Sequence, residues 1–247
     1  MRRLWKTLRD SLASVLFVRT CPVCGERTEG LANGGREVFL CRRCMNSLPR
    51  TGQAARRGNS TEDLFYRHPL FVRGAAFLDY EGVIPNDAGG SMCVRDLVHR
   101  FKFHRQPELA YELAHEAALD FLQSDFFEEV DVIIPVPLHR RRFRWRGYNQ
   151  SEYIARALSD VLKVPMDTEH LWRIRNNPQQ AVMHGEERRE NVRGVFAVTH
   201  PEELYRKHIL LVDDVVTTGS TLLACMEALE VCRGCRISVF GLATAHH

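Results

Sequence analysis

The stretch that most constrains this chain is HILLVDDVVTTGST, at residues 208–221 of 247. Its apolar run, residues 209–212, is short and has β-branched ends, which favours a strand buried on both faces of a parallel sheet. Asp213 and Asp214 then lie at the carboxyl end of that strand, where open α/β sheets bind ligands. The turn that follows leads into a second apolar segment and is expected to open a helix.

The turn at residues 217–221 suits a bound phosphate. It combines a glycine, several hydroxyls and successive backbone N–H groups at the start of the expected helix. The two neighbouring carboxylates would repel an anion unless they hold sugar hydroxyls or a magnesium ion, so a sugar phosphate satisfies both halves. The alternative is a strand that ends in a hydroxyl-capped turn, which is common in α/β proteins. The candidate ligand residues are Asp213, Asp214, Thr217, Thr218, Gly219, Ser220 and Thr221.

Four cysteines near the N-terminus have the spacing of metal ligands. Cys21, Cys24, Cys41 and Cys44 form two Cys-x-x-Cys pairs with sixteen residues between them, as in four-thiolate zinc sites. A structural zinc would supply most of the folding energy of so short a segment. The alternative is unligated buried cysteines or a redox pair. No secretory signal precedes them, so we expect a reducing, cytoplasmic environment.

Composition along the chain predicts three parts. Residues 1–48 hold a basic N-terminal helix and the zinc ribbon, residues 49–70 form a polar linker, and residues 71–247 form the main domain. The apolar run at residues 12–18 is far too short to cross a bilayer. We expect the N-terminal helix to pack against the protein, with peripheral contact to a membrane as the alternative.

A basic segment rich in aromatic residues follows a second expected strand, DVIIPVP at residues 131–137. Guanidinium groups interleaved with aromatic rings suit either a pyrophosphate or a single-stranded nucleic acid whose bases stack. A solvated basic loop is the alternative. The candidate pyrophosphate ligands are Arg140, Arg141 and Arg142, and the candidate nucleic-acid contacts are Arg141, Arg142, Phe143, Arg144, Trp145 and Tyr148.

A polar, arginine-rich segment within residues 171–198 cannot form a core, and we expect it to be a lid that closes over the pyrophosphate. An ordinary surface loop is the alternative. The candidate lid residues are Arg173, Gln180, Arg188 and Asn191.

Periodicity places the other elements. We expect strands at residues 71–80 and 237–242, helices at 92–103, 109–122 and 151–162, and a loop at 81–91. The charges of helix 92–103 should face solvent, with Lys102 and Arg105 approaching an anionic ligand as the alternative. Cys232 and Cys235 are expected to pack in the core.

These segments together resemble the ComF family, also called the competence or GntX-like phosphoribosyltransferase family. The likeness rests on the cysteine ribbon, on the Lys102–Phe103 pair, on IIPVPLHRRRFRWRGYNQ and on VDDVVTTGST. The last of these also resembles the phosphoribosyl pyrophosphate (PRPP) signature of type I phosphoribosyltransferases. The resemblance implies an α/β fold with a parallel sheet flanked by helices. The chain differs from the family pattern in one segment, since Asn177 stands where relatives usually carry threonine and Met183 where leucine is usual.

The resemblance further implies roles for these segments. Asp213 and Asp214 would grip the ribose hydroxyls of PRPP, the turn at residues 217–221 its 5-phosphate, and the loop after Pro137 its pyrophosphate together with magnesium. Residues 173–191 would form a flexible hood. The resemblance also implies a part in DNA uptake and natural transformation, with single-stranded DNA and the uptake machinery as partners.

Two classes of function follow. One is a phosphoribosyltransferase that acts on an acceptor the sequence does not identify, since no general base is evident. The other is a non-catalytic module that binds single-stranded DNA and uses the sugar-phosphate pocket for regulation.

Overall fold

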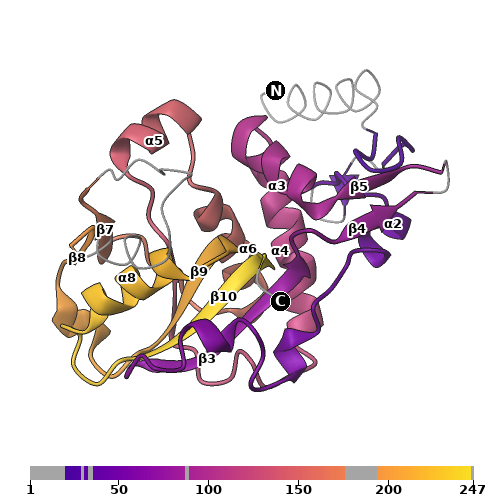
Figure 1. Cartoon of the computed structure of the whole chain (residues 1–247). Helices are drawn as coiled ribbons and strands as arrows, with labels where there is room; N and C mark the ends of the chain where they lie inside the picture. Colours follow the sequence, from indigo (N-terminus) through magenta and orange to yellow (C-terminus); the bar gives the residue numbers. More distant parts are fainter. Residues whose placement is uncertain (1–19, 29–30, 33–35, 87–88, 176–193, 246–247) are drawn as a thin grey trace, which may run out of the picture.

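The computed structural model describes residues 20–28, 31–32, 36–86, 89–175 and 194–245. Its centre is a four-stranded sheet whose strands all run parallel (Figure 1). In spatial order the strands are β3 (Phe71–Asp79), β10 (Arg236–Thr244), β9 (His208–Val216) and β6 (Val132–Pro135). The expected fold class, an α/β fold with a parallel sheet flanked by helices, is confirmed.

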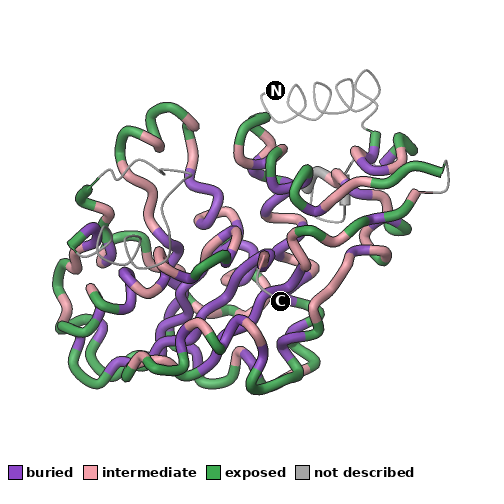
Figure 2. Tube along the Cα trace, in the orientation of Figure 1, coloured by how far each residue is buried: buried purple, intermediate pink, exposed green. Residues whose placement is uncertain are grey.

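Helices cover both faces of the sheet. One face packs against α3 (Val94–Phe103), α4 (Pro107–Phe121) and α6 (Gln150–Leu162), and the other packs against α8 (Ser220–Leu229). Leu210 and Val212 of β9 point into the first layer, whereas Ile209 and Leu211 point into the second. Buried residues accordingly run along the central strands (Figure 2). The apolar run of β9 is therefore buried on both faces, as its sequence predicted.

Smaller elements lie around this core. They are β1 (Leu31–Ala32), β2 (Arg36–Glu37), α2 (Arg42–Asn46), η1 (Gln53–Ala55), η2 (Glu62–Leu64), β4 (Val83–Pro85), β5 (Ser91–Cys93), α5 (Arg140–Arg146), β7 (Leu171–Arg173), β8 (Phe196–Val198) and η3 (Pro201–Leu204). Three pairs of these short strands, β1–β2, β4–β5 and β7–β8, are antiparallel.

The loop expected at residues 81–91 was wrong, because this segment contains most of the β4–β5 hairpin. In β4, Ile84 is buried while Val83 and Pro85 are exposed. An alternation over only three residues is too short to be recognised as a strand from sequence. After β4, Asn86 donates a hydrogen bond of 2.9 Å from Nδ2 to the carbonyl of Val23, which ties the hairpin to the cysteine-bearing segment.

Residues 49–70, expected to be a linker, pack along the edge strand β3. The backbone N–H of Thr51 donates to the carbonyl of Phe77, and that of Asp79 donates to the carbonyl of Pro49, both at 2.9 Å. The segment thus covers part of the open edge of the sheet, which would otherwise expose unpaired backbone groups.

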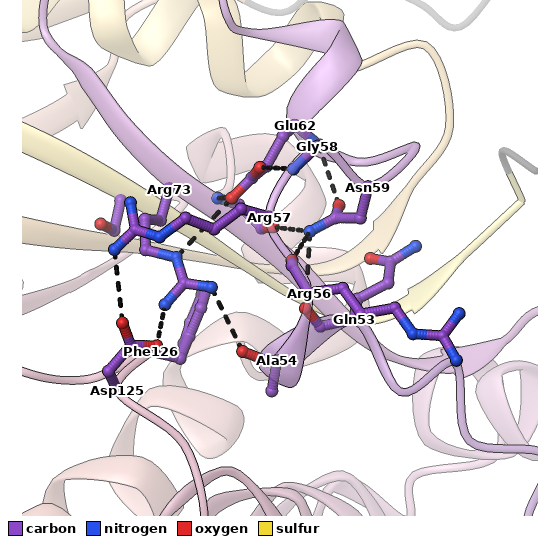
Figure 3. Close-up of polar contacts among 12 residues, drawn as sticks. Gln53, Ala54, Arg56, Arg57, Gly58, Asn59, Glu62, Arg73, Asp125 and Phe126 are labelled. Carbon is purple, nitrogen blue, oxygen red and sulfur yellow. Dashed lines mark hydrogen bonds and ion pairs between the residues drawn. The ribbon is translucent and has the colours of Figure 1, made fainter.

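A buried polar network fixes this segment to the sheet (Figure 3). Arg73 of β3 is 4% exposed and forms ion pairs with Asp125 and with Glu62, while its Nη2 donates to the carbonyl of Ala54. Glu62 in turn accepts a 2.6 Å hydrogen bond from the backbone N–H of Gly58. Two of these partners, Glu62 and the carbonyl of Ala54, belong to the segment that was expected to be a linker, which therefore packs against the sheet.

The cysteine-bearing segment docks on α4. One carboxylate oxygen of Glu112 accepts from the backbone N–H groups of Phe39 and Leu40, at 3.0 and 3.3 Å. Burial raises the pKa of Glu112 to about 7, although these two hydrogen bonds oppose the shift. In the part of the chain that the structure describes, no helix has the length and apolar character needed to cross a membrane. The expected N-terminal helix lies outside the described residues.

Candidate functional site

The two adjacent carboxylates lie inside β9, in its carboxyl-terminal half, because the strand continues to Val216 instead of ending at Val212 as the sequence predicted. Asp213 Oδ1 accepts from Ser151 Oγ at 3.2 Å and from the backbone N–H of Asp214 at 2.9 Å. Asp214 Oδ1 lies 2.8 Å from Lys102 Nζ. The other oxygen, Asp214 Oδ2, is buried and has no hydrogen-bond partner among the described residues. Such an unmade bond is costly unless a ligand completes it.

Crowding of the two carboxylates changes the protonation of the pair. Burial and the negative charge of Asp214 raise the pKa of Asp213 to about 7, while Lys102 and the hydrogen bond from Ser151 oppose the shift. Close to neutral pH the pair therefore holds a proton part of the time, and a bound cation or hydroxyl would favour the fully ionised form.

The turn at residues 217–221 lies next to these carboxylates and leads into α8. Gly219 immediately precedes the helix and has φ +68°. A Cβ atom at this position would come within 2.8 Å of two ring carbons of Phe65, so both the backbone conformation and the packing require glycine. One small pocket includes the turn and the first carboxylate, and is lined by Asp213, Val215, Val216, Thr217, Gly219, Ser220, Thr221 and Leu222. The structure therefore brings together the two halves expected of a sugar-phosphate site.

The basic segment after β6 forms the short helix α5 rather than an open loop. His139 caps it, because its Nδ1 accepts from the backbone N–H of Arg141 at 3.2 Å, and Gly147 ends it with φ +87°. Every residue of α5, all of which the structure describes, is at least partly exposed. Arg140, Arg141 and Arg144 are exposed, which leaves them available to an anion.

The last arginine of α5 packs against α3. Arg146 is half-buried, and its guanidinium carbon lies 5.4 Å from the centre of the Phe103 ring. Burial lowers the pKa of Arg146, and the charge of Asp214 opposes this. Arg146 also donates to the Gln150 side chain. It was not among the expected site residues, although it belongs to the same arginine run.

Two of the three aromatic residues expected to stack on bases are exposed. Phe143 is 44% and Trp145 69% exposed, and Phe103 of α3, at 47%, lies beside Trp145 with ring centroids 6.1 Å apart. Tyr148 differs, because its hydroxyl donates to the carbonyl of Phe101 and its ring is partly buried. The exposed ring surface of this region therefore comes from α5 and α3 together.

Arg173, the first expected lid residue, ends β7, and its guanidinium carbon lies 5.4 Å from the centre of the Phe196 ring. Burial and the positive charge of Arg142 lower its pKa, while the charge of Asp213 raises it. The pKa of Arg173 is therefore affected by charges of both the basic helix and the acidic pair. Gln180, Arg188 and Asn191 lie outside the described residues, as do Asn177 and Met183.

Lys102 is a site residue that helical periodicity did not favour. Helical periodicity favoured solvent for the charges of α3, and approach to the ligand was only the alternative. The structure instead brings this lysine onto Asp214. Ser151 was missed, because a serine in the first turn of a helix usually serves as a cap. Asn149 caps α6 instead, and its Nδ2 donates to the carbonyl of Val136 at 3.1 Å, which holds the loop after β6.

The four N-terminal cysteines converge as expected. Their Sγ atoms all lie within 4.8 Å of one another, and those of Cys24 and Cys41 are 3.6 Å apart. Tetrahedral zinc with Zn–S bonds of about 2.3 Å would separate the sulfurs by about 3.8 Å. Both pairs form tight turns, since Gly25 N–H donates to the carbonyl of Cys21 and Met45 N–H to that of Cys41. The cluster could therefore bind zinc.

The other Cys-x-x-Cys pair behaves differently. Cys232 and Cys235 are both buried in the apolar layer under α8. Burial raises the pKa of both thiols. This agrees with their expected role as packing residues.

Known proteins are similar to this chain over a region that includes β9 and the turn at residues 217–221. Residues 149–247 match the family model described as a phosphoribosyl transferase domain. Competence protein F of Haemophilus influenzae is 36% identical over 154 residues, which cover 60% of this chain and 67% of that protein. DNA utilization protein YhgH of Escherichia coli O157:H7 is 35% identical over 136 residues, which cover 54% of this chain. The match spans 59% of the length of YhgH.

Two solved structures are similar at low identity. One is the allosteric regulatory enzyme of purine biosynthesis, with a TM-score of 0.38, 16% identity, and coverage of 64% of this chain and 34% of that one. The other is the glutamine PRPP amidotransferase of B. subtilis complexed with ADP and GMP, with a TM-score of 0.38, 17% identity, and coverage of 64% and 35%.

Proposed function

Because the chain belongs to the ComF family, with competence protein F and DNA utilization protein YhgH, we propose that it binds PRPP with magnesium and acts in the use of DNA that the cell takes up. The observation that carries the proposal is the shared pocket of Asp213 and the turn at residues 217–221. A carboxylate next to a phosphate-type turn suits a sugar phosphate better than it suits a free sugar or a free phosphate.

The described residues supply a partner for each part of the ligand. Asp214 Oδ2, buried and without a partner among the described residues, would accept from a ribose hydroxyl. The backbone N–H groups at the start of α8 would hold the 5-phosphate. The pyrophosphate would be held by Arg140 and Arg141, which are exposed on α5, and by the adjacent Arg142. Magnesium, when bound, would neutralise the charge of the pyrophosphate.

The catalytic form of the proposal is transfer of the ribosyl group to an acceptor. Positive charge develops on the sugar as its bond to pyrophosphate breaks, and the fixed carboxylates of Asp213 and Asp214 would stabilise that charge. Release of pyrophosphate that depends on an added acceptor tests this form. The cysteines form no disulfide in the described part of the chain, which suits a reducing cytoplasm, where we place the activity.

Calorimetric titration of PRPP with magnesium tests the site. Replacing Asp213 and Asp214 by alanine should abolish measurable binding, because charge-assisted hydrogen bonds contribute roughly 1.5–3 kcal/mol each. Asp96→Ala, at an exposed position of α3, is the matched control and should bind as the wild type does. Equal affinity of the wild type and the double variant would rule out this pocket as the PRPP site.

A second function, binding of single-stranded DNA, is favoured by the exposed rings of Phe143 and Trp145 among the arginines of α5. Bases stack on such rings while guanidinium groups contact phosphates. Arg141→Ala with Arg144→Ala should weaken binding and flatten its salt dependence by about 0.7 for each phosphate that is no longer neutralised. Arg67→Ala, at an exposed position of the segment 49–70, is the control. Fluorescence anisotropy of labelled DNA at several salt concentrations gives both quantities.

The two functions are coupled if both ligands use the arginines of α5. PRPP with magnesium should then weaken DNA binding by about tenfold, and DNA should weaken PRPP binding by the same factor. This reciprocal effect would favour a regulatory role for the sugar-phosphate pocket. Unchanged DNA affinity at saturating PRPP would contradict a shared site.

A further inference from the structure

Lys102 is a feature of the site that the proposed function leaves unexplained. It lies in the last turn of α3, where the helix dipole favours a cation, and outside the residues that match the phosphoribosyl transferase domain model. Only 21% of its side chain and 7% of the Asp214 side chain are exposed. At 2.8 Å this is a mostly buried ion pair, unlike exposed pairs, which contribute little.

Three oxygens of the acidic pair, Asp213 Oδ1 and both of Asp214, differ in their availability. Asp213 Oδ1 already accepts two hydrogen bonds, and Asp214 Oδ1 is held by Lys102. Asp214 Oδ2 is buried and lacks a partner among the described residues. One such oxygen is enough to accept a hydrogen bond from a ribose hydroxyl. A magnesium ion on the same carboxylate would lie close to the ammonium group, and it also demands near-octahedral geometry.

A second cation, Arg146, supports the same conclusion, that a metal ion is disfavoured on Asp214. Arg146 is half-buried, and its pKa responds to the charge of Asp214. Its guanidinium lies over Phe103, the residue that follows Lys102. Positive charge from α3 and α5 therefore acts on Asp214, chiefly through the direct contact of Lys102, and it opposes the binding of a further cation there.

Resting on the proposed function, we propose that the ammonium group of Lys102 occupies the place beside Asp214 that a metal ion would otherwise take. The ribose 5-phosphate end of the ligand then binds without a divalent ion, and magnesium serves only the pyrophosphate end. Lys102 is a positioning residue, because it acts on the ligand through Asp214. The affinity for the sugar phosphate then does not depend on the magnesium concentration.

Ribose 5-phosphate is the probe that separates the two ends, because it lacks the pyrophosphate. Its affinity is measured by calorimetry in buffer freed of divalent ions before the protein is added, since a chelator would strip zinc from the cysteine cluster. Wild-type affinity should be the same with and without millimolar magnesium. Lys102→Met should bind about tenfold more weakly without magnesium, as expected for removal of a charge-assisted hydrogen bond, and regain affinity when magnesium is added.

Two further variants are controls for this result. Lys102→Arg keeps the charge and should retain the magnesium-independent binding of the wild type. Lys207→Met removes an exposed lysine at the opposite end of the sheet and should change nothing. If Lys102→Met does not fold, Lys102→Gln, which removes the charge and keeps a donor, carries the same expectation. Wild-type affinity that rises with magnesium as steeply as that of the uncharged variant would overturn the proposal.

A metal titration without sugar phosphate provides an independent measurement. With Lys102 removed, Asp214 has two oxygens free, so Lys102→Met should bind Mn²⁺ about tenfold more tightly than the wild type. Equal Mn²⁺ affinity would overturn the proposal. If ribose 5-phosphate binds neither protein at any magnesium concentration, the proposed function fails, and the Mn²⁺ titration still decides whether Lys102 occupies the place of a metal ion.

Discussion

Gly219→Ala should be among the most damaging small substitutions in the chain, because two separate effects add. A non-glycine residue in the left-handed region is destabilised by about 1–2 kcal/mol, and Gly219 has φ +68°. The new Cβ would also lie 2.8 Å from two carbons of Phe65, which is buried and packs on Phe71 with ring centroids 5.7 Å apart. Overpacking of this kind adds about 1–3 kcal/mol. The expected loss of stability is therefore about 2–5 kcal/mol.

Gly52→Ala isolates the backbone effect. Gly52 has φ +67°, almost the same as Gly219, but no described atom lies within 4 Å of the position of its Cβ. This variant should lose only about 1–2 kcal/mol. Phe65→Leu combined with Gly219→Ala isolates the steric effect, because the shorter side chain makes room for the methyl group. The two substitutions should be less than additive by about 1–2 kcal/mol.

Urea unfolding followed by circular dichroism measures these differences in zinc-loaded protein. Ribose 5-phosphate affinity of the folded variants shows whether a displaced turn also loses the phosphate. An equal loss of stability in Gly219→Ala and Gly52→Ala would refute the steric effect of Phe65. Simple additivity of Phe65→Leu and Gly219→Ala would refute it as well.

Three further variants test other parts of the structure. Arg73→Met leaves Glu62 buried without its guanidinium and should lower the free energy of unfolding by about 3–5 kcal/mol, so an unchanged urea midpoint would contradict the network. The pKa of Asp213 is about 7 in the folded protein, against about 3.9 when unfolded, so the native state binds more protons between these values and its stability falls as pH rises across them. Asp213→Asn removes that fall. The thermal midpoint of the variant minus that of the wild type should therefore increase from about pH 4 to about pH 7 and stay constant at higher pH. A difference that does not depend on pH would contradict the assignment. Cys44→Ser should reduce zinc from about one equivalent to well below one, measured by atomic emission after chelator-free purification, and full retention would show that the cysteine cluster is not the zinc site.

Features encoded over a few consecutive residues could be predicted from the sequence. The apolar run of β9 indicated a doubly buried strand, and the carboxylates that follow it lie toward its carboxyl end. The spacing of the cysteines indicated a four-sulfur cluster, which the structure forms. In each case the signal was local, because strand burial and ligand spacing are both read within one segment.

Contacts between distant segments could not be predicted. Lys102 faces Asp214 only because α3 packs against the sheet near the end of β9, and periodicity alone favoured solvent for its charge. The polar composition of residues 49–70 suggested a linker, since nothing in that segment shows that its partner is a buried arginine of β3.

The sequence by itself determined the α/β class, the acidic pair, the phosphate-type turn and the cysteine cluster. The tertiary structure alone decided which groups complete them: Lys102 on Asp214, Ser151 on Asp213 and Phe65 beneath Gly219. The physical reason is that propensity and periodicity act between near neighbours, whereas these pairs form only after β3, β9 and β10 join in one sheet. That strand order places β3 beside β10, although most of the main domain separates them along the chain, and no local pattern encodes it (Figure 1).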